Sequence, residues 1–216
     1  MPPRHLLPRA SLLLAAAALV LAACSPTTST SLQATGLSPQ PDGWRGIPIE
    51  LDQELPDVTL QDVEGQPVHL GEDHLGTPTL LFFGYTNCPD ICPIHLAAIA
   101  SAMSSVGVTF DEIDVVFVSV DPDRDTPERI AEYLDNFHPR MTGLHGDLDT
   151  VQAALDQLEL PGPVVEGADP RGEGDLIGHP AQVIGFDADG EAHRVWPFGT
   201  RRSDWVVDLP RIVDEW

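Results

Sequence analysis

Two cysteines, Cys88 and Cys92, carry the strongest chemical signal in the chain. They stand in the run Cys88-Pro-Asp-Ile-Cys92, directly after a short apolar stretch. On a helix counted from near Cys88, residues i and i+4 share one face, so both sulfurs can meet one ion or each other. A helix N-terminus also favours thiolate over thiol, and a thiolate is either a metal ligand or a nucleophile.

Three kinds of site fit this pair of thiols. Thiolates combined with an imidazole suit Cu(I), Cu(II) or Zn(II). The pair could instead cycle between dithiol and disulfide, although its three intervening residues differ from the two of a typical disulfide oxidoreductase. The third possibility is a structural disulfide, which would close a very short loop and add little stability compared with a longer crosslink.

The elements around the cysteines predict how they are held. The apolar run 78–85 is typical of a buried central strand, and a helix is expected from Pro93 to about Ser105. A second buried strand, 115–120, leads into a helix that begins near an Asp or Thr cap and ends at about 137. Asp121 and Asp125 could form a paired-carboxylate acid/base site, but their positions at the end of that strand and the start of that helix favour capping.

The remaining elements complete the expected sheet. An alternating segment, 58–70, predicts a hairpin at the edge of the sheet. A Gly- and Pro-rich segment, 161–178, predicts a long loop. The other predicted elements are a strand at 142–146, a helix at 149–158, a hairpin of strands 181–186 and 191–196, and a helix at 204–214. This order predicts an α/β fold, a thioredoxin-like mixed sheet flanked by helices, with an N-terminal β-hairpin extension.

The N-terminus accounts for the third cysteine. Residues 1–23 have a basic start and an apolar run that is too short to span a bilayer, as in a signal peptide. The run ends in Leu21-Ala22-Ala23-Cys24, which looks like a bacterial lipobox and predicts lipidation of Cys24. Residues 24–55 are rich in Ser, Thr, Pro and Gly and predict a flexible tether. The folded domain is expected to cover 56–216.

Charge excludes several classes of partner. The chain has 34 acidic and 11 basic residues, a formal net charge of −23. Such a chain repels phosphate backbones, so we expect no binding to nucleic acid. It is not attracted to anionic lipid either, so any attachment to a membrane must be covalent or hydrophobic.

Three blocks of sequence together resemble the Sco/SenC family. The run Phe83-Gly-Tyr-Thr-Asn-Cys-Pro-Asp-Ile-Cys-Pro93 is similar to the family's signature, and Val118–Glu128 is similar to its strand-to-helix segment. The third block is His179, placed shortly before a strand and the D-x-x-G turn at 187–190. Pro180 departs from the family's pattern, in which a small hydroxyl residue commonly follows the histidine.

The resemblance implies a thioredoxin-like copper protein. One copper ion, Cu(I) or Cu(II), would be bound by Cys88, Cys92 and His179, and the glycine-rich loop could swing His179 toward or away from the thiolates. The implied function is that of a copper chaperone, a thiol reductant or both in assembly of the copper centre of cytochrome c oxidase. The implied partners are the copper-containing subunit of that oxidase and other copper chaperones. Lipid on Cys24 would hold the protein at the extracytoplasmic face of a bacterial membrane.

Rival interpretations involve the same region. His95, one helical turn after Cys92, is a candidate substitute ligand, and Asp90 could tune the charge of the thiols. A thiol peroxidase needs a reactive cysteine with Thr and Arg nearby; Thr86 is present, but no Arg lies close in sequence. The cysteine pair would also suit a general thiol-disulfide oxidoreductase of the cell envelope, or a copper or redox sensor.

Overall fold

The structure is a computed structural model that describes residues 37–216. The predicted signal peptide 1–23, the lipidation site Cys24 and the first part of the predicted tether lie outside the described residues.

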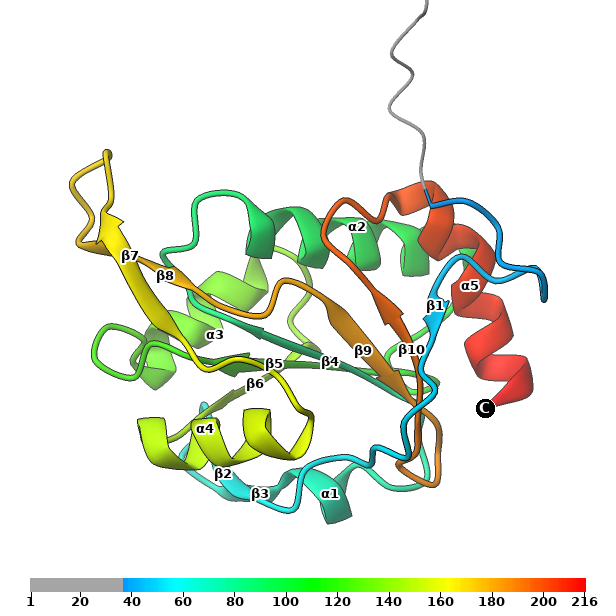
Figure 1. The fold of residues 1–216 in the computed structure, drawn as a ribbon, viewed down its shortest axis with the longest axis horizontal. Helices are drawn as coiled ribbons and strands as arrows, with labels where there is room; N and C mark the ends of the chain where they lie inside the picture. The colour runs from blue at the N-terminus through cyan, green and yellow to red at the C-terminus, as the bar shows by residue number, and fades with distance from the viewer. Residues whose placement is uncertain (1–36) are drawn as a thin grey trace, which may run out of the picture. The chain divides into compact units, whose positions relative to one another are not determined.

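One eight-stranded mixed sheet forms the centre of the described chain (Figure 1). Its strand order is β1-β10-β9-β4-β5-β6-β2-β3. The central strands β4, β5 and β6 are parallel, while β9 pairs antiparallel with β4. The strands are β1 (Ile47–Pro48), β2 (Thr59–Asp62), β3 (Pro67–His69), β4 (Thr79–Gly84), β5 (Asp114–Ser119), β6 (Thr142–His145), β9 (Val183–Phe186) and β10 (Ala192–Trp196).

Helices cover both faces of this sheet. They are α1 (Leu70–Asp73), α2 (Ile91–Val106), α3 (Pro127–Asp135), α4 (Leu148–Gln157) and α5 (Arg202–Glu215). The parallel crossovers through α2 and α3 leave both helices on one side, where α5 packs beside α2, and α4 lies on the other side (Figure 1). The predicted α/β thioredoxin-like arrangement is confirmed, and the predicted hairpin, β2 and β3, forms one edge of the sheet.

Local sequence explains where the helix next to the cysteines begins and ends. The Asp90 side chain accepts a hydrogen bond from the N–H of Ile91 and caps the start of α2. Gly107 ends the helix in the left-handed conformation, with φ of 78°, which glycine adopts without a steric penalty. All six residues of β4 are buried, as its unbroken apolar sequence predicts.

The segment 161–178, expected as a loop, contains two strands instead. These are β7 (Val164–Ala168) and β8 (Asp175–Gly178), which pair as a separate antiparallel ribbon that projects from the body of the domain (Figure 1). All five residues of β7 are exposed, so no alternation of apolar and polar residues marks it as a strand. The ribbon leads directly to His179.

Residues 37–55, expected as part of the flexible tether, pack on the domain. Trp44 is buried, and β1 pairs with β10. The N–H of Leu37 donates to Asp204 on α5 at 3.1 Å. Burial of an indole ring and strand pairing outweigh the Pro- and Gly-rich composition, so the folded part begins earlier than predicted.

Among residues 37–216, none of the helices has the length and apolar character needed to cross a membrane.

Candidate metal centre

The loop between β4 and α2 holds the first cysteine. The N–H of Cys88 donates to the carbonyl of Tyr85 at 3.1 Å, which closes a tight turn. Cys88 therefore lies three residues before the start of α2. The i and i+4 spacing instead predicts that Cys88 lies on the helix itself. The turn still brings the two cysteines together, because the N–H of Cys92 donates to the Cys88 sulfur at 3.4 Å.

Cys92 lies in the first turn of α2 and is fully buried, whereas Cys88 is 6% exposed. Gly84, the last residue of β4, makes this close approach to the sheet possible. A Cβ atom at position 84 would lie only 2.8 Å from the Cys92 sulfur. Both cysteines are free thiols in the structure.

His179 follows the ribbon and brings an imidazole to the sulfurs. Its Nε2 lies 3.5 Å from Cys92 Sγ and 3.9 Å from Cys88 Sγ. Its Nδ1 lies 2.9 Å from the carbonyl oxygen of Pro180, a contact that orients the ring with Nε2 toward the thiols. The ligand atoms of the three residues lie within 4.8 Å of one another, close enough to bind one ion.

The two thiols differ sharply in acidity. Hydrogen bonding from the Cys92 thiol, with further contributions from His179 and backbone N–H groups, lowers the pKa of Cys88 to about 4. Burial raises the pKa of Cys92 well above its ordinary value, and the neighbouring Cys88 charge adds to that rise. The site therefore presents a thiolate at Cys88 and a protonated thiol at Cys92.

The buried carboxylate of Asp125 holds the loop between β4 and α2, which contains Cys88. Asp125 is 2% exposed and accepts hydrogen bonds from the Thr86 N–H at 3.0 Å, the Thr86 hydroxyl at 2.6 Å and the Ser119 hydroxyl at 2.6 Å. Of the Asp or Thr cap predicted for this helix, the Thr alternative is confirmed, and the expectation that Asp121 and Asp125 act as caps is wrong. Thr126 is the cap of α3, which leaves Asp125 free to fix the loop.

An arginine that sequence spacing does not reveal also reaches this loop. The Nε of Arg129, on α3, donates to the Thr86 hydroxyl at 2.9 Å, and its guanidinium also donates to the Asn87 side chain. The fold thus supplies the Arg near Thr86 that a thiol peroxidase needs and that the sequence lacks nearby. Cys88 is nevertheless paired with Cys92 and His179 rather than isolated.

His95 does not join the three ligands. It is fully buried, and its Nε2 lies 3.0 Å from the carbonyl oxygen of Ala181. Asp90 is the cap of α2, and its side chain is exposed. Neither residue belongs to the convergent cluster of ligand atoms.

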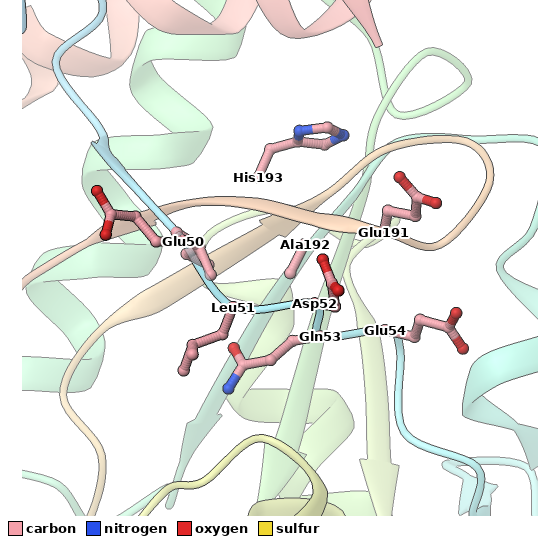
Figure 2. Close-up of a pocket in the computed structure, with 9 residues that line it drawn as sticks. Glu50, Leu51, Asp52, Gln53, Glu54, Glu191, Ala192 and His193 are labelled. Carbon is pink, nitrogen blue, oxygen red and sulfur yellow. The ribbon is translucent and has the colours of Figure 1, made fainter.

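A second group of metal-binding residue types lies on the β9–β10 hairpin. Figure 2 shows Glu191 and His193 beside a pocket of about 530 Å³ that is also lined by Glu50, Asp52 and Glu54. His193 Nε2 lies 2.7 Å from Asp187 Oδ2. The other Asp187 oxygen accepts two backbone N–H groups of its own turn. These hydrogen bonds stabilise the turn between β9 and β10 and occupy the Asp187 carboxylate. We therefore take the cysteine and histidine cluster as the candidate metal site.

Comparison with known proteins identifies the family that the chain resembles. The family model described as SCO1/SenC matches residues 50–214. Protein sco1 of Schizosaccharomyces pombe is 32% identical over 142 residues, covering 65% of this chain and 52% of the relative. The chain thus spans about half the length of that curated relative.

Solved structures also match the described fold. Bradyrhizobium japonicum ScoI with copper bound has 29% identity and a TM-score of 0.61, covering 77% of this chain and 98% of that one. Yeast Sco1 with copper bound has 25% identity and a TM-score of 0.67, covering 77% of this chain and 91% of that one.

Proposed function

The chain belongs to the SCO1/SenC family, and we propose that it binds one copper ion through Cys88, Cys92 and His179 for assembly of the copper centre of cytochrome c oxidase. The observation that carries the proposal is the convergence of two sulfurs and one imidazole nitrogen within 4.8 Å. Soft thiolates with a borderline imidazole select copper over hard cations. The copper-bound relatives of similar fold support the same choice.

The acidity of the thiols suits capture and release of copper as cargo. The low pKa of Cys88, about 4, lets this sulfur bind the ion near neutral pH without first losing a proton. Cys92 must lose its proton to bind, so binding releases a proton and proton return favours release. The partner would be the copper-containing oxidase subunit, whose cysteines displace these ligands by exchange.

A second activity of the same residues is reduction of the partner's thiols. The Cys88 thiolate attacks the partner's disulfide, forms a mixed disulfide and releases one partner thiolate. Cys92, once deprotonated, attacks the Cys88 sulfur and releases the second partner thiolate. The partner's disulfide gains two electrons, and Cys88 and Cys92 end as a disulfide. The low pKa of Cys88 keeps the attacking thiolate populated near neutral pH. The same stabilisation of the thiolate favours the dithiol form, so this pair would be a weak reductant.

One pair of incubations separates these two activities. Copper-loaded protein is mixed with the reduced copper-binding domain of the oxidase subunit, and metal-free protein is mixed with the same domain in disulfide form. Copper appearing on the domain in the first mixture supports delivery, and free domain thiols in the second support reduction. If copper does not appear on the domain and no free domain thiols form, both roles are refuted.

We further propose that the mature chain is anchored through lipid on Cys24 and acts on the extracytoplasmic face of a bacterial membrane. The lipobox-like run Leu21-Ala22-Ala23-Cys24 supports this proposal. In a native host, a Cys24→Ser variant should no longer be found in the membrane fraction. Its mass should lack the contribution of the lipid. Retention of the variant in that fraction would contradict the anchor.

A further inference from the structure

We call residues 177–181, which carry His179, the strap. At its first residue, the N–H of Ile177 donates to the Tyr85 hydroxyl oxygen at 3.2 Å. Tyr85 is buried, directly follows β4 and accepts the N–H of Cys88 at its carbonyl. Its ring also meets the His179 ring edge-on, with the centroids 5.6 Å apart. Tyr85 therefore joins the start of the strap to the loop that holds the first sulfur.

His95 holds the other end of the strap. Its Nε2 lies 3.0 Å from the carbonyl oxygen of Ala181, and it stands on α2 one turn after Cys92. The ring is fully buried, and its Nδ1 has no partner in the part of the chain that the structure describes. Burial lowers the pKa of His95 to about 4, so near neutral pH the ring is uncharged and donates Nε2–H to the carbonyl. The hydrogen bond of His95 within the described residues is therefore the one from Nε2 to the Ala181 carbonyl oxygen of the strap.

We propose that Tyr85 and His95 are positioning residues that set the reach of His179 to the two sulfurs. Both stand on the elements that hold the cysteines, and each binds the strap two residues from His179, one on either side. These two side chains therefore tie the strap to the elements that hold the sulfurs and set the distance of the third ligand from them. This inference rests on the proposed copper site.

The first test measures copper affinity in single variants. The full chain is used with Cys24→Ser throughout, so that Cys88 and Cys92 are its only thiols. Tyr85→Phe and His95→Leu should each weaken Cu(I) binding about fivefold in competition with a colorimetric chelator, the effect of one lost hydrogen bond. His95→Gln, whose amide can donate to the same carbonyl, should restore most of the affinity. Unchanged affinity in Tyr85→Phe and His95→Leu would overturn the proposal.

Tyr133→Phe is the matched control for the tyrosine. The Tyr133 hydroxyl is buried and has no hydrogen-bond partner within residues 37–216, so its removal breaks no such contact. Copper affinity should stay within twofold of the parent. A loss equal to that of Tyr85→Phe would show that any missing buried hydroxyl has this effect, and would overturn the assignment.

A His179→Ala background distinguishes positioning from general structure. There the strap carries no ligand, so Tyr85→Phe and His95→Leu should no longer change the affinity. A loss that persists in this background would overturn the positioning role. If His179→Ala itself leaves copper affinity unchanged, the proposed ligand set fails, and positioning toward it fails as well.

A metal-free measurement tests the strap's attachment apart from copper. Amide hydrogen exchange at Ile177 should be at least about fivefold faster in Tyr85→Phe than in the parent or Tyr133→Phe, because its acceptor is gone. Unchanged exchange would overturn the attachment even if the copper site is correct. Faster exchange with unchanged copper affinity would overturn the positioning role alone.

Discussion

The two ends of the molecule bury polar groups in opposite ways. At the tryptophan end, where Trp44, Trp196 and Trp216 lie near α5, Asp208 is fully buried and accepts N–H groups from Arg45, Gly46 and the Trp196 indole. At the metal end, which consists of Cys88, Cys92 and His179, two sulfurs and one imidazole nitrogen converge within 4.8 Å of one another. The hydrogen bonds to Asp208 stabilise the fold, whereas the three convergent ligand atoms form the candidate metal site.

The tryptophan end also explains why the N-terminal segment is ordered. The guanidinium groups of Arg194 and Arg211 each lie over the Trp44 ring, at 4.4 and 4.3 Å from its centroid, and Trp44 stacks on Trp216 at 5.3 Å. These contacts involve residues far apart in the sequence, and none of the four side chains is a ligand for a soft metal. This end should affect stability without affecting copper.

The largest expected effect concerns the acidity of Cys88. With its pKa lowered from 9.0 to about 4, Cys88 should hold roughly a thousandfold more thiolate at pH 6 than an ordinary thiol. Because the sulfur is already ionised, its alkylation rate should stay flat from pH 8 to pH 5 and fall as pH drops through about 4. Peptide mapping after iodoacetamide treatment measures the rate. A tenfold rise per pH unit between 5 and 8 would contradict the assigned acidity.

The next effect separates the two ends by copper affinity. Cys92→Ala removes a ligand at the metal end and should weaken Cu(I) binding more than about a hundredfold, beyond the range typical of residues that merely support ligands. Chelator competition measures the affinity. A change of less than tenfold would mean that Cys92 is not a ligand.

The reverse separation uses Asp208→Ala at the tryptophan end. It leaves three N–H groups without their acceptor but also removes a buried charge, so the free energy of unfolding should fall by about 2 kcal/mol. Urea unfolding measures this loss. Copper affinity should stay within twofold, and a parallel loss of affinity would show that the two ends are coupled.

The smallest expected effect concerns Asp125, which holds the loop before α2. The Asp125 carboxylate accepts hydrogen bonds from three donors, and Asp125→Asn leaves only one acceptor oxygen for them. The free energy of unfolding should therefore fall by about 1 kcal/mol. Asp123→Asn, a change at an exposed neighbour, is the matched control and should have no measurable effect. Equal effects in the two variants would remove Asp125 as a support of the loop.

Sequence reasoning predicts the part of the site that is contiguous in the chain. Cys88 and Cys92 lie only four residues apart in the sequence, and the apolar strand before them restricts where they can lie. His179 follows only from the family resemblance, because nothing local to it specifies a thiolate partner. The structure brings it to the sulfurs as predicted.

The supports of the site depend on tertiary contacts that spacing does not encode. Asp125 has the sequence position of a helix cap, yet the Thr126-Pro127 pair supplies the cap and the proline of the first helical turn. Arg129 lies 43 residues from Thr86 in sequence and still reaches its hydroxyl. The sequence predicts a loop where the ribbon delivers His179, because the ribbon's glycines and exposed residues give no strand pattern.

X-ray absorption spectroscopy of the Cu(I)-loaded protein, with Cys24 replaced by Ser, tests the central claim most directly. Two sulfur ligands and one imidazole nitrogen around the metal are predicted, with the nitrogen lost in His179→Ala and one sulfur lost in Cys92→Ala. A copper ion with only oxygen and nitrogen ligands, or a spectrum unchanged by both substitutions, would contradict the site.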